Sequence, residues 1–242
     1  MNLRGNWLWP GRLWCVLCLL ACSILAPSRA FGISYFEGWS GHIGLGGTYL
    51  RIHQSTLDQP VRQYYLTAKG GLRYAFPDSI IEFSANAFGS IYHFRHIPSQ
   101  KARADVLGYN IRGSLRFSHR PSGWFLRLTG GVYTLQTTVA GQIYGISNLV
   151  GPQGIVSIHQ KWKKRSETLS FYVKYAPIAS KLSQLNLLYS REAAAGMSVQ
   201  ISNWRHRPPA YLNIDYSSLN IRITGVPAVT VRSMSVGVSL GF

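Results

Sequence analysis

The chain ends in Val229-Thr230-Val231-Arg232-Ser233-Met234-Ser235-Val236-Gly237-Val238-Ser239-Leu240-Gly241-Phe242. From Met234 onward every second residue is apolar, and the residues between them are serine or glycine. Successive side chains of a β-strand point to opposite faces. The alternation therefore predicts a strand with one apolar face and one face of small residues, ending on its apolar face at an aromatic residue.

This ending resembles the C-terminal signal of bacterial outer-membrane β-barrel proteins, whose last strand ends in Phe and is read by the barrel-assembly machinery. The resemblance is to this broad class and not to a specific family. It implies an all-β, antiparallel, up-and-down transmembrane β-barrel in the bacterial outer membrane. It also implies that Phe242 is the assembly signal and that the assembly machinery is a partner.

The N-terminus predicts a cleaved signal peptide over residues 1–30, followed by a barrel domain over residues 31–242. Arg4 and Arg12 precede an apolar stretch that runs from Leu13 to Ala26, and Ser28-Arg29-Ala30 provides small residues before the cleavage site. The apolar stretch is shorter than the roughly 20 residues of a membrane-spanning helix. A lipoprotein signal ending at Cys22 is the alternative.

All three cysteines, Cys15, Cys18 and Cys22, lie in the predicted signal peptide. Cleavage after Ala30 would leave a mature chain without cysteine. We therefore expect no disulfide, no zinc-thiolate site and no cysteine nucleophile, and neither a metal nor another cofactor.

Composition is that of a barrel with a basic character. Hydrophobic residues make up 46% of the chain and charged residues only 14%, with a formal net charge of +17. Removing the three arginines of the signal peptide leaves +14. Such a charge attracts anionic partners, namely lipopolysaccharide phosphates, acidic glycan or small anions, and we expect no nucleic acid. A generally basic proteome is the alternative explanation.

Alternating stretches predict ten strands, with eight as the alternative. An even number places both termini on the periplasmic side. In the strand predicted to begin at Ala210 the apolar parity changes, which predicts a β-bulge near Ser217-Ser218. The ten predicted strands are Gly41–Ile52, Arg62–Phe76, Ser79–His93, Asp105–Ser118, Trp124–Gln136, Leu149–Trp162, Glu167–Pro177, Ala193–Asn203, Ala210–Thr224 and Val229–Phe242.

The parity of the strands also sorts the charged residues into a lumen set and a rim set. Glu82 and Asp215 are the two acids predicted to face the lumen. In one interpretation the lumen is plugged, and these acids and water satisfy the cations. In the other, the lumen attracts anions. The predicted lumen cations are Lys69, Arg73, Arg112, Arg116, Arg127, Lys161 and Lys174. The predicted basic rim includes Arg95, His96, Lys101 and Arg103, together with Arg51, His53, Arg62, Lys181, Arg191 and Arg232.

Catalytic constellations are weak in this sequence. Outer-membrane phospholipases and lipid A deacylases resemble it in architecture and carry a His and a Ser two residues apart. Here the pairs are Ser40/His42 and Ser157/His159, in the reverse order and without a carboxylate to orient the His. Omptin-type proteases need clustered acids in the outer loops, and only Asp58 and Asp105 lie there in the first half of the chain.

The sequence thus predicts a non-enzymatic outer-membrane barrel with a basic rim and lumen. Its expected role is structural, adhesin-like or surface-binding towards anionic glycan or lipopolysaccharide, with the surrounding outer-membrane lipids as partners. A narrow anion-preferring pore is the alternative, and a lipid-modifying hydrolase comes third.

Overall fold

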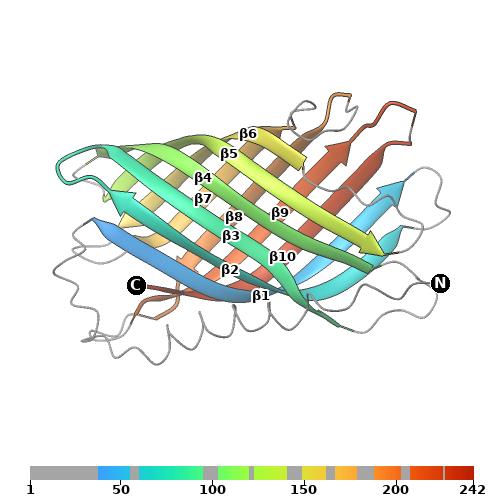
Figure 1. Cartoon of the computed structure of the whole chain (residues 1–242). Coiled ribbons are helices and arrows are strands. Elements are labelled where there is room, and N and C mark those ends of the chain that lie inside the picture. Colours follow the sequence, from blue (N-terminus) through green and yellow to red (C-terminus); the bar gives the residue numbers. More distant parts are fainter. Residues whose placement is uncertain are drawn as a thin grey trace, which may run out of the picture. The chain divides into compact units, whose positions relative to one another are not determined.

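The computed structural model describes residues 38–54, 60–94, 103–119, 123–140, 149–161, 167–178, 188–202, 208–225 and 227–242. Within these residues the chain forms ten antiparallel strands that close into a barrel (Figure 1). Each strand pairs with its sequence neighbours, and β1 pairs with β10 to close the sheet. The prediction of ten strands is confirmed. The predicted signal peptide lies outside the described residues.

All ten predicted strands are present, with differences at their ends. The eighth strand begins and ends earlier than predicted, and the ninth ends earlier. The strands are β1 (Trp39–Gln54), β2 (Val61–Ala75), β3 (Ile81–Phe94), β4 (Arg103–His119), β5 (Trp124–Ala140), β6 (Leu149–Lys161), β7 (Glu167–Pro177), β8 (Arg191–Gln200), β9 (Ala210–Ile221) and β10 (Val229–Gly241).

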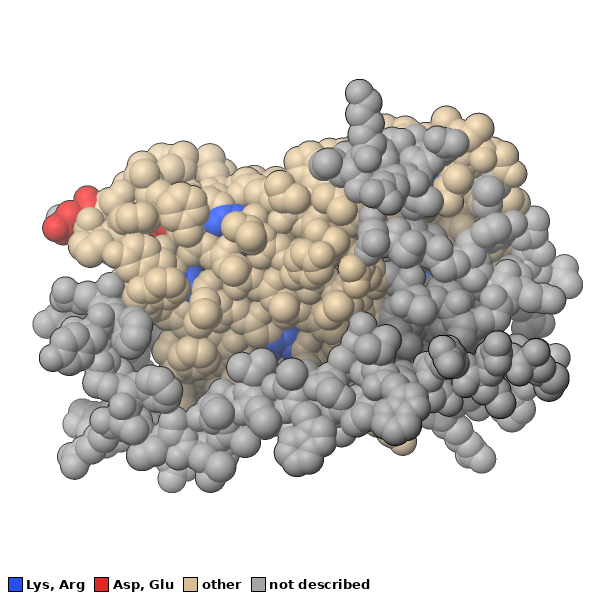
Figure 2. Space-filling model, in the orientation of Figure 1, with Lys and Arg blue, Asp and Glu red and all other residues tan. Residues whose placement is uncertain are grey.

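The outward face of the barrel is apolar. Ile111 on β4 is 70% exposed and Val173 on β7 is 63% exposed, and Val236, Val238 and Leu240 alternate outward along β10. Figure 2 shows one side of the barrel, where Lys and Arg appear only as scattered patches among the described residues. Such a surface is suited to lipid, because the closed sheet leaves no unpaired edge and its outward side chains meet acyl chains.

The two ends of the barrel differ, and we call them the turn end and the loop end. At the turn end β2 and β3 are joined tightly through Pro77-Asp78, and Asp78 has a φ of 55°. Asp tolerates this left-handed conformation well. Phe242 lies at the same end, next to Gly41. At the loop end β1 finishes at Gln54 and β10 begins at Val229.

An apolar cluster crosses the lumen near the loop end, and we call it the apolar layer. Its side chains come from seven strands on all sides of the barrel, and Phe88 of β3 and Val106 of β4 pack against it. Leu149 and Ala176 are 0% exposed. The apolar layer consists of Leu50, Ile52, Val61, Tyr65, Tyr133, Leu135, Leu149, Ala176, Ile178, Leu219, Ile221 and Val229.

This layer explains why the predicted bulge at Ser217-Ser218 is wrong. The pairing of β9 with β10 continues without a shift through Ser217↔Ser233 and Ser218↔Arg232. Leu219 and Ile221 are apolar because they point into the lumen and join the layer. A register shift does occur between β2 and β3, where Ile91 of β3 has no register partner on β2.

Candidate functional site

Between the apolar layer and the turn end, the lumen contains a cavity of about 800 Å³. It reaches from Pro209, Gly241 and Phe242 at the turn end to Tyr65 and Phe88 beside the layer. Six of the seven predicted lumen cations line it, namely Lys69, Arg73, Arg112, Arg116, Arg127 and Lys174. Lys161 ends β6, but its side chain is outside the described part of the structure.

Glu82 on β3 is the centre of the first charged group. Its carboxylate is 3% exposed and lies 2.8 Å from the Nε atom of Arg127, a close ion pair without the alignment of a hydrogen bond. Arg116 and Arg73 lie farther away, at 3.9 and 4.0 Å. The Arg116 guanidinium also lies over the ring of Phe125, 4.4 Å from its centre. One buried carboxylate is therefore shared by three arginines from β2, β4 and β5.

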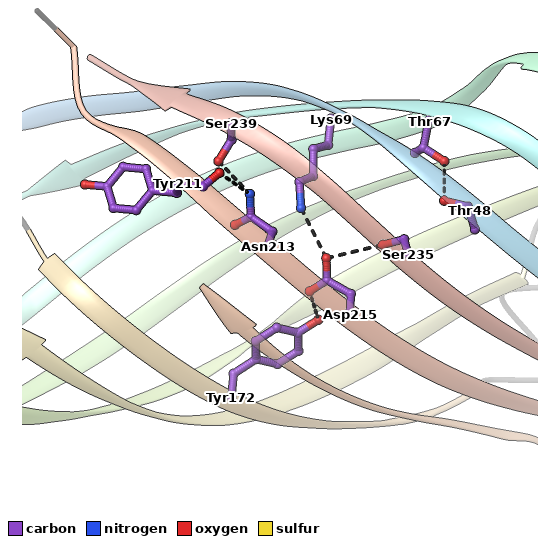
Figure 3. Close-up of polar contacts among 9 residues, drawn as sticks. All are labelled: Thr48, Thr67, Lys69, Tyr172, Tyr211, Asn213, Asp215, Ser235 and Ser239. Carbon is purple, nitrogen blue, oxygen red and sulfur yellow. Dashed lines mark hydrogen bonds and ion pairs between the residues drawn. The ribbon is translucent and has the colours of Figure 1, made fainter. Parts of the chain in front are cut away.

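Asp215 on β9 is the centre of the second group, shown in Figure 3. The Nζ atom of Lys69 lies 3.1 Å from its carboxylate. The hydroxyl of Tyr172 donates to the other carboxylate oxygen at 2.8 Å, and Ser235 donates at 3.4 Å. Nearby, Asn213 donates to Ser239 at 2.8 Å. These contacts link β2, β7, β9 and β10 across the lumen.

Glu192 is a third inward acid, which the sequence analysis missed. Its carboxylate lies 2.9 Å from the Nζ atom of Lys174, which is also 4.0 Å from the centre of the Tyr133 ring. The strand was predicted to begin at Ala193, whereas β8 begins at Arg191. Glu192 has the parity of the inward Ala194, so extending the start of the predicted strand by one residue would have included it.

The buried pair Ser157/His159 is held by a cation. Ser157 Oγ lies 2.8 Å from His159 Nε2, and an Nη atom of Arg127 lies 3.0 Å from the same nitrogen. Because a guanidinium only donates, that nitrogen accepts. Phe125 stacks on the imidazole at 4.7 Å. A triad instead uses a carboxylate to orient the His, whereas here an arginine contacts the imidazole.

The other predicted pair, Ser40/His42, also lines the cavity, and Arg73 donates to the Ser40 hydroxyl at 3.0 Å. The Ser40 hydroxyl thus accepts a hydrogen bond from a cation. No group of three His, Cys, Asp or Glu side chains that could hold a metal ion occurs among the described residues.

A row of arginines lies on the outward face near the loop end. Arg51 on β1 is the register partner of Arg62 on β2 and of Arg232 on β10. All three residues are exposed, and we call them the arginine row. The predicted rim residues Arg95, His96 and Lys101 lie outside the described residues, and only the backbone of Arg103 is described.

No protein-family model matches this chain, and no curated protein sequence matches it. Its fold is similar to those of solved bacterial outer-membrane proteins. The translocator domain of the autotransporter NalP from Neisseria meningitidis is 8% identical, with 98% of this chain and 99% of that chain covered and a TM-score of 0.40. Neisserial surface protein A is 9% identical, with 84% and 97% covered and a TM-score of 0.38.

Ail, the attachment invasion locus protein of Yersinia pestis, is 12% identical, with 84% of this chain and 98% of that chain covered and a TM-score of 0.36. Closure of the sheet, the apolar outer face and the polar lumen together define the architecture of this class. The chain forms a closed, ten-stranded antiparallel β-barrel with the architecture of a membrane-spanning barrel.

Proposed function

We propose that this barrel is a non-enzymatic, non-conducting surface protein that binds lipopolysaccharide phosphates through the arginine row. The observation that carries the proposal is the register of Arg51, which faces an arginine on each neighbouring strand. The row lies at the seam where β1 and β10 close the barrel.

The depth of the row fits lipid headgroups. On β1, Tyr49 comes directly before Arg51 on the outward face, and its ring lies 5.0 Å from that of Tyr64 on β2. Farther towards the turn end, the outward residues of β1 and β10 are apolar. Aromatic residues of outer-membrane barrels gather at the membrane interface. The arginines beyond them therefore reach the level of the phosphates.

The charge of the row calls for an anion. Residues directly opposite on paired strands have their Cα atoms about 4.5–5.5 Å apart, and like charges at such positions destabilise the sheet. Arg51 and Arg232 form such a pair, and Arg62 extends it. A phosphate accepts paired hydrogen bonds from guanidinium groups, so one phosphate can bridge neighbouring arginines. We expect both termini to lie in the periplasm because the number of strands is even, and the loop end would then face the outer leaflet, where lipopolysaccharide lies.

The lumen supports a non-conducting role. The apolar layer crosses it with side chains that are at most 8% exposed. An ion crossing this layer would lose its hydration without gaining polar partners. The expected result in planar bilayers is no steady conductance from folded protein, whereas steady anion-selective conductance would favour the pore alternative.

Binding of lipopolysaccharide by protein folded in detergent micelles tests the arginine row. The variant Arg51→Ala/Arg232→Ala should bind fluorescent lipopolysaccharide at least tenfold more weakly, since a hydrogen bond to a charged group contributes about 1.5–3 kcal/mol. The matched control Arg191→Ala/Arg222→Ala removes two exposed arginines outside the row and should bind like the wild type. Equal binding by the row variant, or equal binding of lipid A without phosphates, would exclude the proposal.

A further inference from the structure

The cavity below the apolar layer carries a surplus of positive charge. Among the residues that the structure describes, six cationic and three acidic side chains line it. Each acid already has a close cation, because Glu82 pairs with Arg127, Asp215 with Lys69 and Glu192 with Lys174. The charge left over is therefore positive, and it lies inside a barrel whose wall faces lipid.

Among the cations of the cavity, Arg112 on β4 has no acidic partner of its own among the described residues. Its Nε atom is buried and has no hydrogen-bond partner among the described residues, and no ion pair to it occurs there. Its charge is within electrostatic range of Glu192 and Tyr172, and also of the cation Lys174 and of His42. Glu192, the acid within electrostatic range of Arg112, is already paired with Lys174. Arg112 is half-buried, and a guanidinium partly removed from water without a hydrogen-bonded anion is costly.

The surroundings of Arg112 provide neutral donors as well. Ser84 is its register partner on β3, and Asn86 and Asn110 lie two residues along the same inward faces. Asn86 donates to Asn110 at 3.1 Å, and all three side chains line the cavity. A guanidinium fork flanked by amide and hydroxyl groups matches the geometry of a phosphate or carboxylate.

We propose that Arg112 is the main contact of an internal oxyanion site, which takes a phosphate- or carboxylate-bearing small molecule entering from the turn end. The ligand is held and is not conducted, because the apolar layer closes the lumen beyond it. This site is separate from the arginine row, which faces outward.

Inorganic phosphate is the probe for this site, added to the mature protein folded in detergent micelles. Phosphate should raise the unfolding temperature of the wild type in a saturable manner, because a ligand that binds only the folded state stabilises it. Arg112→Gln should weaken the apparent affinity at least tenfold. The matched control Arg191→Gln removes an exposed, outward arginine and should keep the wild-type response. An unchanged response in Arg112→Gln, or no response in the wild type, overturns the proposal.

Two further variants keep this test interpretable. Arg112→Lys keeps the charge but loses the fork, so it should fold and bind phosphate more weakly than the wild type. Arg51→Ala/Arg232→Ala should keep the full phosphate response, and loss of the response in this variant would assign phosphate to the outward row instead. Without phosphate, Arg112→Gln should be at least as stable as the wild type, because it removes a buried charge. A lower stability there would contradict an uncompensated Arg112.

Discussion

Gly131 on β5 lies where two strands approach closely. A Cβ atom there would clash with the Ile111 carbonyl oxygen and lie 2.9 Å from the Cα atom of Arg112. Both are backbone atoms, so β4 or β5 would have to shift. We expect Gly131→Ala to lower the free energy of unfolding by about 1–3 kcal/mol, the usual cost of overpacking, as measured by urea titration in lipid vesicles.

The neighbouring glycine supplies the control for this substitution. A Cβ atom at Gly130 would meet nothing within 4 Å. Gly130→Ala should therefore change the free energy of unfolding by no more than about 0.5 kcal/mol. Equal losses in the two variants would contradict the close approach of β4 and β5 at Gly131.

At the same scale, the sequence predicted which cations face the lumen but not their partners. Parity along a strand assigns a face to Lys69 or Arg127 without any knowledge of the fold. The partner depends on which residues of distant strands the tilt of the barrel brings to the same height. Lys69 and Asp215 are 146 residues apart, and no local pattern relates them. That the Nε atom of Arg112 has no hydrogen-bond partner among the described residues could be seen only in the structure.

Among the strands, β9 is the one whose pattern was misread. A change of apolar parity has two explanations, a bulge or a lumen that becomes apolar at one end, and sequence periodicity alone does not separate them. The start of β8 was misplaced for a similar reason, because small residues such as Ala193 and Ala195 do not show which face is apolar. Strand existence, in contrast, was predicted well because the lipid-facing side demands apolar residues in every strand.

The uninterrupted register of β9 and β10 can be tested by crosslinking. The hydroxyl oxygens of Ser217 and Ser233 are 2.8 Å apart. In a chain beginning at Phe31, which has no cysteine, Ser217→Cys/Ser233→Cys should form a disulfide in most molecules on mild oxidation, because opposed residues fall within disulfide range. Labelling of free thiols measures the extent.

The diagonal pair Ser217→Cys/Ser235→Cys is the control for that register. Its side chains are displaced by two residues, with Cα atoms about 7–8 Å apart, so crosslinking should be much slower. Preferential crosslinking of the diagonal pair would place a shift between β9 and β10 after all.

The lumen of the barrel has two parts of different chemical character. The turn-end half is charged and lined by serine, asparagine and tyrosine, while the loop-end half is apolar. This division explains how a barrel can hold buried cations without forming a pore. The sequence pointed to a basic lumen, but the apolar layer was hidden from it, because inward apolar residues look like lipid-facing ones.

The last residue of the chain, Phe242, takes part in closing the barrel, and we predict it to be the assembly signal. The amide of Phe242 donates to the carbonyl of Gly41 at 2.9 Å, and the amide of Gly41 donates to the carbonyl of Phe242 at 2.7 Å. The Phe242 ring lies against Gly41 and is exposed on the outside, where a receptor can reach it. Deleting Phe242 should reduce the heat-modifiable, folded protein in outer membranes severalfold, as measured on gels, while Phe242→Tyr should assemble normally.

Refolding without cellular machinery separates recognition from stability. Two hydrogen bonds of about 0.5–1.5 kcal/mol each are a small part of the ten-stranded closure, so the deletion variant should still fold in detergent micelles. Failure in cells together with success in micelles assigns Phe242 to recognition by the assembly machinery. Failure to fold both in cells and in micelles would show that Phe242 is needed only for barrel closure. Normal assembly of the deletion variant in cells would show that Phe242 is not the assembly signal.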